Sequence, residues 1–212
     1  MQTRSHRPLI SLTVVVAMLV LANKADAGAR RSRPVRTGQL TCWDTTGAVI
    51  DCAGTGQDRE LRRGENRSYQ DNGDGTIRDK RTALTWEKLS DDGSIHDKDN
   101  TYTWANAFVK IADLNAAAFA GFTDWRLPNV NELETIRQIE VLDPAVTAAF
   151  NTGCADGCTV LTCSCTRSTF YWTSSSYAGS GNLAWVVTFY DGYAYRDTKG
   201  GVNWVRAVRG GS

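Results

Sequence analysis

The sequence predicts an α+β domain that disulfides staple together. Two helical patterns lie between groups of strand patterns instead of alternating with them, which favours a mixed or antiparallel sheet with two helices over βαβ units. Six Cys, an even number, indicate disulfides in an exported protein. The formal net charge of +1 excludes a strongly basic nucleic-acid-binding protein, and seven Trp with 22% charged residues exclude wholesale disorder.

Residues 1–27 have the features of a secretory signal peptide. Arg4 and Arg7 precede an apolar run over residues 9–21, and Ala25-Asp26-Ala27 forms a small-x-small cleavage site. The apolar run is shorter than the roughly 20 residues that a membrane-spanning helix needs. We therefore expect cleavage, no stable membrane insertion afterwards, and a secreted, periplasmic or cell-surface location. An uncleaved anchor is the alternative.

Residues 28–38 contain four Arg and one Pro and are predicted to form a disordered basic linker. A basic surface tether is the functional alternative. In the next segment, 39–66, Cys42 and Cys52 lie on either side of a turn-forming Thr-Thr-Gly sequence. We expect a hairpin closed by a Cys42–Cys52 disulfide, followed by a polar connection to a domain over residues 67–212.

The other four cysteines, Cys154, Cys158, Cys163 and Cys165, lie within twelve residues. Four cysteines allow three pairings, and sequence alone does not choose among them. A Cys163–Cys165 bond is disfavoured because so small a ring is strained, and we favour Cys154–Cys165 with Cys158–Cys163. A zinc site is the alternative, but paired Cys-x2-Cys knuckles and a nearby His are absent.

Two amphipathic helices are predicted in the middle of the chain. The first covers residues 103–115, with Thr103 as its N-cap and with Trp104, Phe108 and Ile111 on its apolar face. The second begins at Asn129, where Glu132 completes a capping box, and its apolar stripe continues to Ile139.

Short strands are predicted on both sides of these helices. Asp191-Gly192 is a strong signal for a hairpin turn. In the last strand, Val205 and Ala207 are expected on one face, with the residues between them on the other. The predicted strands cover residues 76–79, 83–86, 170–174, 183–189, 193–195 and 203–209.

Catalytic groups are scarce in this sequence. Signal-peptide cleavage removes His6, which leaves His96 in a polar loop over residues 91–100, where we expect it to be solvated and not to act as a base. A glycosidase needs only two carboxylates, but no acid pair stands out. We therefore predict a protein that is not an enzyme.

Three aspartates offer a candidate calcium site. Asp71, Asp74 and Asp79 flank a Gly-rich turn, and oxygen ligands around such a turn suit calcium; we otherwise expect no cofactor. An EF-hand does not fit, because Gly73 and Gly75 fall at positions that need ligand side chains. An Asx turn that leads into a strand is the favoured alternative.

Aromatic residues concentrate near the C-terminus: ten of the twenty Phe, Trp and Tyr lie within residues 170–204. Strand alternation cannot bury all ten, so we expect at least three to be exposed. Aromatic faces offer flat, rigid contact area for sugar C–H faces or for a protein partner. The predicted ligand-binding residues are Tyr177, Trp185, Tyr190, Asp191, Tyr193, Tyr195, Arg196 and Trp204.

Several segments resemble the Lcl C-terminal domain family, in the same order and spacing over roughly residues 68–210. They include DNGDGT at 71–76, DWRLP at 124–128, YWTS at 171–174 and VRAVRG at 205–210. The resemblance implies a C-type-lectin-like fold and exported proteins that act in adhesion or recognition, including glycosaminoglycan binding in a collagen-like adhesin.

We expect five residues of these and neighbouring segments to be structural: Trp86, Trp104, Trp125, Arg126 and Pro128. Trp125 would bury its ring while Arg126 pairs with an acid. The predicted function is that of a secreted or cell-surface, non-catalytic domain that binds a glycan or a host or cell-surface protein. The alternatives are an extracytoplasmic enzyme, either a hydrolase or a relative of formylglycine-generating enzymes, and a structural envelope protein.

Overall fold

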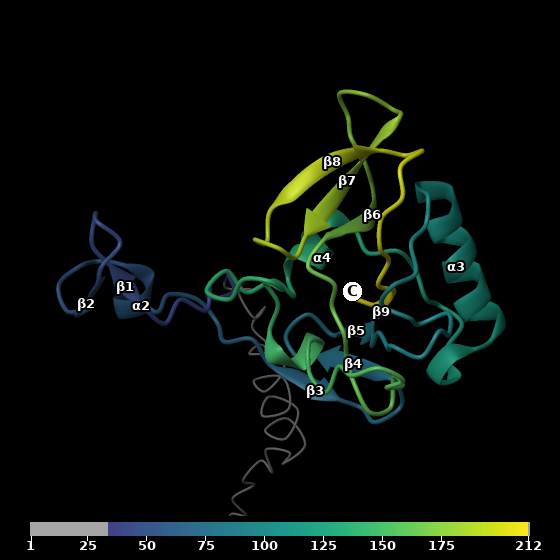
Figure 1. The fold of residues 1–212 in the computed structure, drawn as a ribbon, viewed down its shortest axis with the longest axis horizontal. Coiled ribbons are helices and arrows are strands. Elements are labelled where there is room, and N and C mark those ends of the chain that lie inside the picture. The colour runs from purple at the N-terminus through teal and green to yellow at the C-terminus, as the bar shows by residue number, and fades with distance from the viewer. Residues whose placement is uncertain (1–33, 212) are drawn as a thin grey trace, which may run out of the picture. The chain divides into compact units, whose positions relative to one another are not determined.

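The computed structural model describes residues 34–211, so the predicted signal peptide and residues 28–33 of the predicted linker lie outside the described residues. Within them the architecture is α+β, with three antiparallel sheets, few helices and three disulfides (Figure 1). The predicted fold class is thereby confirmed at this level. Residues 34–211 contain no helix with the length and apolar character that crossing a bilayer requires.

The segment around Cys42 and Cys52 forms the expected disulfide-closed hairpin. Strand β1 (Cys42–Trp43) pairs antiparallel with β2 (Val49–Ile50), and the Cys42–Cys52 disulfide closes the loop. A short helix that the sequence did not predict, α2 (Asp58–Leu61), follows in the polar connection.

Residues 34–38, the end of the predicted disordered linker, are instead held by hydrogen bonds. Arg36 N donates to Glu65 O at 3.0 Å, and Glu65 N donates to Pro34 O at 2.9 Å. Gly64 permits this close approach, because its φ is +100° and a Cβ there would lie 2.5 Å from Pro34 O. The prediction of disorder was wrong for these residues because local composition does not reveal a backbone partner almost thirty residues away.

A four-stranded antiparallel sheet has the order β3-β4-β5-β9, so the C-terminal strand pairs with β5. The bounds of β4 and β5 agree with the prediction to within one residue, whereas β3 was not predicted. The strands are β3 (Tyr69–Asp71), β4 (Thr76–Asp79), β5 (Leu84–Glu87) and β9 (Val208–Gly210).

The last strand is shorter than the predicted 203–209. Asn203 and Trp204 form only isolated bridges, because this segment passes along other parts of the fold before it joins β5. The predicted alternation still holds, since Val205 and Ala207 enter one core cluster and Val208 enters the other.

Helix α3 (Trp104–Ala116) agrees with the first predicted helix to within one residue at each end. Thr103 Oγ1 accepts a hydrogen bond from Asn106 N at 3.3 Å and caps the helix as predicted. The helix ends before Ala118, whose left-handed conformation breaks the helical path. A separate turn of 3-10 helix, η1 (Phe119–Gly121), follows it.

Helix α4 (Val130–Glu134) begins with the predicted capping box between Asn129 and Glu132. It is shorter than expected, because the apolar stripe suggested a helix that continued to Ile139. The chain turns back after Glu134 instead, and Gln138 N donates to Ala145 O at 2.9 Å. Pairing with a later segment therefore replaces the last helical turns.

The third sheet has the order β6-β7-β8, and in Figure 1 it lies at the opposite end of the domain from β3 and β4. Neighbouring residues of β6 enter different core clusters: Tyr171 packs in the first and Trp172 in the second. Both faces of β6 are therefore buried at this point. The strands are β6 (Phe170–Ser176), β7 (Leu183–Thr188) and β8 (Ala194–Thr198), and a 3-10 turn, η2 (Ala148–Phe150), precedes them.

The residues that were expected to be structural pack in or beside this core. Trp104 Nε1 donates to Thr173 O at 2.9 Å. Arg126 makes a two-pronged contact with the Glu132 carboxylate, at 2.7 and 2.6 Å, and so pairs with an acid as expected. The other three are buried: Trp86, Trp125 and Pro128.

Candidate functional site

The sheet β6-β7-β8 carries most of the residues that were predicted to bind a ligand. Residues that pair across neighbouring strands share a face of the sheet. Val186 pairs with Tyr195, and Trp185 pairs with Arg196, so these two pairs lie on opposite faces. The predicted residues are therefore divided between two faces and the turn that joins β7 to β8.

Four aromatic side chains near this turn are exposed, which exceeds the expected minimum of three. Tyr193 is 61% exposed and Tyr190 is 59% exposed, and both belong to the predicted hairpin turn. The rings of Phe170 and Tyr195 meet edge to face, with centroids 5.9 Å apart. Single exposed aromatic residues are common on protein surfaces, but a group of them at one place indicates a binding surface.

A hollow of about 250 Å³ lies beside Phe170 and Tyr195. Its wall combines these rings and Val186 with two residues of β8, Arg196 and Asp197. Asp197 Oδ2 accepts a hydrogen bond from Asn203 Nδ2 at 2.8 Å, which orients the carboxylate. The hollow therefore offers aromatic faces together with a carboxylate acceptor, a combination that suits a polyhydroxylated ligand.

A second aromatic group lies on the opposite face of the same sheet. The rings of Tyr177 and Trp185 meet edge to face at 5.5 Å, and the Arg196 guanidinium lies 5.2 Å from the centre of the Tyr177 ring. The Arg196 guanidinium therefore belongs to this second group, on the face opposite Tyr195, and the outer strand β8 carries a residue of each group.

Two of the predicted ligand-binding residues make contacts within the fold. Trp204 is half-buried against the main core cluster, and Asp191 Oδ1 accepts a hydrogen bond from Tyr193 N at 3.3 Å within the turn. We leave both out of the candidate site. The remaining predicted residues, with two that line the hollow, are called the aromatic surface: Phe170, Tyr177, Trp185, Tyr190, Tyr193, Tyr195, Arg196 and Asp197.

The expectation that His96 is solvated was wrong. Its side chain is 14% exposed, its Nδ1 lies 2.8 Å from Glu87 Oε1, and its ring stacks 4.3 Å from the ring of Phe119. Glu87 is fully buried, and Lys110 Nζ lies 3.0 Å from the same carboxylate. The polar sequence around His96 gave no sign that the loop folds back onto a buried acid.

Lys110 was the signal in the sequence that could have revealed this cluster. Phe108 was expected on the inner face of α3 but is 40% exposed, whereas Lys110 is buried beside Ile111. A charged residue at an inward helical position needs a partner of opposite charge. Glu87 on β5 is that partner.

The Glu87 carboxylate is kept ionised by its neighbours. Burial by itself raises its pKa, but the charge of Lys110, the hydrogen bond and charge of His96, and the hydrogen bond from Ala207 N together lower the pKa to about 2. Donors thus engage both carboxylate oxygens. The cluster ties β5 to α3 and to the C-terminal segment.

Arg206 is a second fully buried cation. Its Nη1 donates to Glu87 O at 2.8 Å, and its Nη2 donates to Cys165 O at 2.5 Å and to Thr166 Oγ1 at 2.8 Å. The guanidinium therefore links the C-terminal segment to β5 and to the disulfide loop. We call Glu87, His96, Lys110 and Arg206 the buried ionic cluster.

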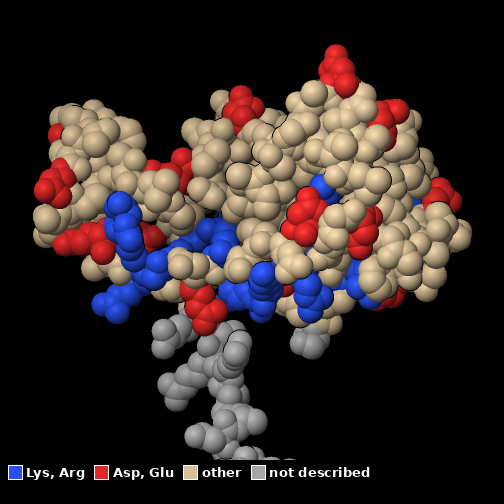
Figure 2. All heavy atoms as spheres, turned by 90° about the horizontal axis from the view of Figure 1, so that it is seen from below, with Lys and Arg blue, Asp and Glu red and all other residues tan. Residues whose placement is uncertain are grey.

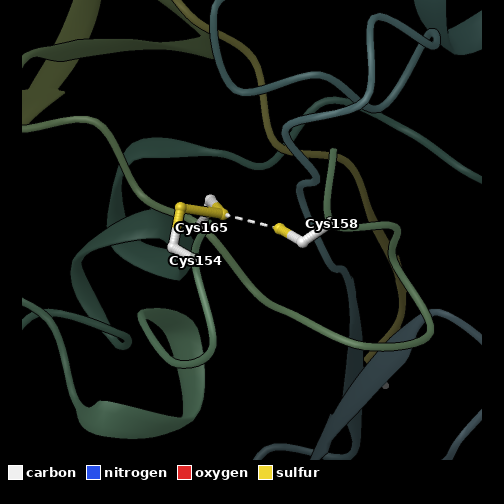
Figure 3. Close-up of side chains that lie close together, drawn as sticks. All are labelled: Cys154, Cys158 and Cys165. Atoms are coloured by element: carbon white, nitrogen blue, oxygen red, sulfur yellow. Dashed lines mark hydrogen bonds between the residues drawn. A yellow bond between two sulfur atoms is a disulfide. The ribbon is translucent and has the colours of Figure 1, made fainter. Parts of the chain in front are cut away.

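The cysteine loop has the pairing that the sequence favoured, Cys154–Cys165 and Cys158–Cys163. Figure 3 shows Cys158 beside the Cys154–Cys165 disulfide, with its sulfur 3.8 Å from that of Cys165. Every cysteine of the described chain is bonded, so these sulfurs carry no proton and their contact is one of packing. Without a thiolate, the loop has no ligand to offer zinc.

The three aspartates of the candidate calcium site do not converge on a common point. Each accepts a hydrogen bond from the backbone N–H two residues later, at 2.9 Å for Asp71, 3.0 Å for Asp74 and 2.9 Å for Asp79. Asp71 also pairs with Lys88 at 2.7 Å. Among residues 34–211 they are absent from the groups of three ligand atoms that lie within 4.8 Å of one another. The Asx-turn interpretation accounts for them.

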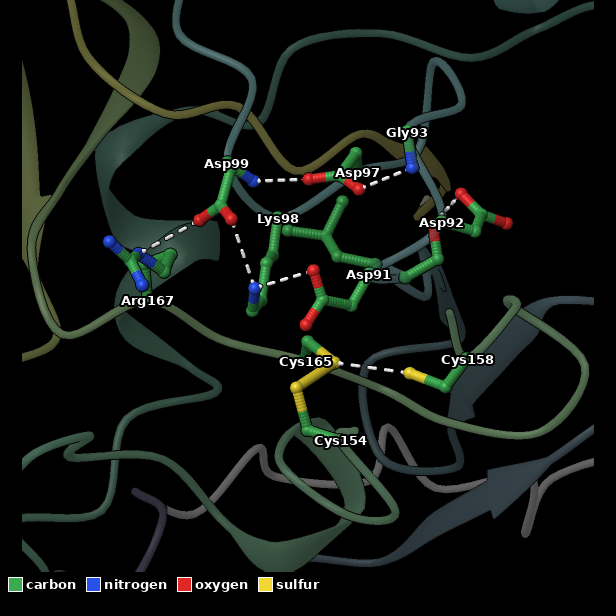
Figure 4. A network of polar contacts seen from close by, with 12 residues as sticks. Asp91, Asp92, Gly93, Asp97, Lys98, Asp99, Cys154, Cys158, Cys165 and Arg167 are labelled. Carbon is green, nitrogen blue, oxygen red and sulfur yellow. Dashed lines mark hydrogen bonds and ion pairs between the residues drawn. A yellow bond between two sulfur atoms is a disulfide. The ribbon is translucent and has the colours of Figure 1, made fainter. Parts of the chain in front are cut away.

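A different set of acids, Asp91, Asp97 and Asp99, does converge (Figure 4). Lys98 Nζ lies 2.7 Å from Asp91 Oδ1 and 3.0 Å from Asp99 Oδ2, and Arg167 Nε lies 3.2 Å from Asp99 Oδ1. Lys98 and Arg167 thus already pair with two of these carboxylates. The ion pairs hold the loop over residues 91–100 next to the cysteine loop.

The fold and these sites together define a disulfide-stapled α+β domain with a buried ionic cluster and an exposed aromatic surface. The family model of the Lcl C-terminal domain matches residues 75–209, and the chain belongs to that family. A search of curated proteins finds no match to the chain.

Proposed function

We propose that this protein is a secreted or cell-surface, non-catalytic recognition domain that binds a glycan through the aromatic surface. The observation that carries the proposal is the exposure of Phe170, Tyr190, Tyr193 and Tyr195 around one end of β6-β7-β8. Exposed aromatic rings lose little conformational entropy when they bind, and their faces suit sugar C–H groups. Asp197 beside Tyr195 supplies an acceptor for hydroxyl groups, and Arg196 supplies a donor on the opposite face of the sheet.

Export and the finer fold assignment are part of this proposal. Three disulfides are typical of proteins in oxidising compartments, and residues 1–27 have the composition of a signal peptide. A C-type-lectin-like arrangement is the fold that the family resemblance implies. The α+β order and the antiparallel sheets are compatible with it.

The state of the acid and base groups supports a non-catalytic role. Glu87 and His96 are the pair that most resembles a catalytic dyad in the described chain, but they are bound to each other and to Lys110 inside the fold. Neither lines the hollow of the aromatic surface. A buried carboxylate with a pKa of about 2 is also a poor general base near neutral pH.

A glycan array tests the proposal with the mature, disulfide-bonded protein. Three variants are compared with the wild type: Tyr195→Ala and Arg196→Ala in the aromatic surface, and Trp43→Ala in the N-terminal hairpin. Trp43 is 47% exposed, the same fraction as Tyr195, and therefore controls for the loss of a solvent-facing aromatic ring. We expect wild type and Trp43→Ala to bind the same glycans and the other two variants to lose that binding.

Two results would overturn the proposal. One is the absence of any glycan signal from folded wild-type protein. The other is a glycan signal that Tyr195→Ala and Arg196→Ala both retain in full. A protein ligand that only these two variants fail to bind would assign the same surface to a protein partner.

A further inference from the structure

A cavity of about 660 Å³ near the N-terminal hairpin is lined by four arginines. Arg36 and Arg67 come from the segments on either side of the hairpin, and Arg59 and Arg62 come from α2 and its C-cap. Figure 2 shows Lys and Arg side chains gathered on the face that it presents. All four arginines precede residue 75, so the cavity wall belongs mainly to a part of the chain outside the family match.

The positive charge of this cavity is not neutralised by the protein. Asp58 is the one carboxylate among the lining residues, and its side chain accepts a hydrogen bond from the Thr37 hydroxyl. Within residues 34–211, none of the four arginines forms an ion pair. Arg36 is bonded only to neutral oxygens, those of Gly64 and Asn66.

Two buried donors in the lining lack a partner. Arg67 Nε and Thr147 Oγ1 are both inaccessible to solvent and make no hydrogen bond in the described chain, although both residues line the cavity. An unsatisfied buried polar group costs about 1–3 kcal/mol and therefore calls for an explanation. Because neither atom has accessible surface, a ligand in the cavity contacts them only if the lining side chains shift.

The environment of Arg67 also favours an anion. Burial lowers the pKa of its guanidinium, and the positive charge of Arg137 lowers it further. The group nevertheless stays charged, as arginine does in proteins. A negative ligand would relieve this repulsion.

The wall is preorganised by backbone contacts. Arg36 is fixed by the pairing of residues 34–36 with Glu65, and Gly64 has the conformation that this pairing needs. Arg67 Nη1 donates to Arg36 O and so joins the two segments. The two guanidiniums are thus positioned before any ligand arrives, which lowers the entropic cost of binding.

We infer that this arginine cavity binds a tetrahedral oxyanion, the phosphate or sulfate group of an anionic ligand. Guanidinium groups bind such oxyanions through paired N–H donors. The four guanidinium groups offer more N–H donors than the single Asp58 carboxylate in the cavity wall can accept. The site is separate from the aromatic surface, and its existence does not depend on glycan binding there.

Isothermal titration calorimetry of the mature protein with inorganic phosphate and with sodium sulfate, at constant ionic strength, tests the inference. The key variant is Arg59→Gln/Arg62→Gln, because these two side chains make no hydrogen bond within residues 34–211, so the change removes charge without breaking a contact of that kind. The matched control, Arg63→Gln/Arg78→Gln, removes the same charge at exposed positions outside the cavity. Arg67→Gln is a less clean variant, because it also breaks the bond to Arg36 O.

We expect saturable binding of at least one ion to wild type and to the control, and an affinity lower by about tenfold or more in Arg59→Gln/Arg62→Gln. Parallel titrations with polyphosphate and dextran sulfate distinguish phosphate from sulfate ligands. The preferred oxyanion is that of the polymer that binds wild type more tightly and whose affinity falls further in the variant. The inference is overturned if wild type shows no saturable binding of either ion. It is equally overturned if the two double variants bind alike.

Discussion

The buried ionic cluster and the aromatic surface both reverse the usual distribution of side chains. Charged groups normally lie outside and aromatic groups inside, but Glu87 and Arg206 are fully buried, whereas Tyr190 and Tyr193 are about 60% exposed. In the cluster, every carboxylate oxygen of Glu87 has a donor. On the aromatic surface, the rings have much of their area free.

This difference separates stability from function in the molecule. A buried charge is costly unless partners compensate it, so the cluster fixes how β5, α3 and the C-terminal segment pack. An exposed ring adds little to folding, so its presence points to an external partner. Substitutions in the two regions are therefore expected to have opposite effects on folding and on binding.

The largest expected effect on folding comes from Glu87→Gln. This change leaves Lys110 buried without its counter-charge, and breaking one side of a buried ion pair costs about 3–5 kcal/mol. Urea unfolding at neutral pH measures the loss of unfolding free energy. Asp124→Asn is the control, because it breaks an exposed ion pair with Arg209, for which we expect a loss below about 1 kcal/mol. Equal losses of unfolding free energy in the two variants would show that the buried ion pair stabilises the fold no more than the exposed one.

The pH dependence of stability follows from the same carboxylate. The pKa of Glu87 is about 2 in the folded protein, against an ordinary value of 4.5. A lowered pKa stabilises the fold above 4.5, and this contribution, about 3 kcal/mol, is lost as the pH falls from 4.5 toward 2. The free energy of unfolding of the wild type, measured with urea, should therefore fall steeply as the pH falls over this interval. Glu87→Gln should show a shallower slope there; an unchanged slope would assign the acid sensitivity to other groups.

Two disulfides differ in their distance from the buried ionic cluster: Cys154–Cys165 adjoins it, and Cys42–Cys52 does not. Cys165 belongs to the main core and its carbonyl accepts from Arg206, whereas Cys42 lies in the hairpin outside both core clusters. The closed loops are similar, with separations of 11 and 10 residues, so loop entropy predicts about 3 kcal/mol for either bond.

We expect Cys154→Ser/Cys165→Ser to lower the free energy of unfolding of the whole domain by about 3 kcal/mol. Cys42→Ser/Cys52→Ser should loosen only the hairpin. Native-state hydrogen exchange distinguishes the two outcomes: the first variant loses protection in β5 and β6, and the second keeps it. Loss of protection in the core of both variants would show that the hairpin is part of the same cooperative unit.

The smallest expected effect on folding comes from Tyr193→Ala. Its ring is 61% exposed, so we expect the free energy of unfolding to change by less than about 0.5 kcal/mol. Thermal unfolding of this variant beside the wild type gives the measurement. A loss above about 1 kcal/mol would mean that the ring packs for stability and is not held ready for a ligand.

Local sequence signals predicted the elements whose causes are local. The capping box at Asn129, the N-cap at Thr103 and the turn at Asp191-Gly192 each depend on side chains within a few residues, and the structure contains all three. Ring strain argued against a Cys163–Cys165 bond and left two pairings, and the structure contains the one that was favoured, Cys154–Cys165 with Cys158–Cys163. Alternation in the last segment correctly assigned the faces of residues 205 and 207.

Elements whose causes are distant in the sequence were not predictable. His96 meets Glu87 only after the loop over residues 90–100 folds back, and the early end of α4 reflects pairing with Ala145. The arginine cavity joins residues from Arg36 to Thr147, so no window of the sequence displays it. The composition of residues 170–204 indicated exposed aromatics, but only the strand register shows that they divide between two faces.

The most direct test of this account is the affinity of Tyr193→Ala/Tyr195→Ala for the glycan that wild type binds best on the array, measured by calorimetry beside the unfolding free energy of the same preparation. We expect the affinity to fall by about tenfold or more while stability changes by less than about 1 kcal/mol. An unchanged affinity in the folded double variant would contradict the assignment of recognition to the aromatic surface.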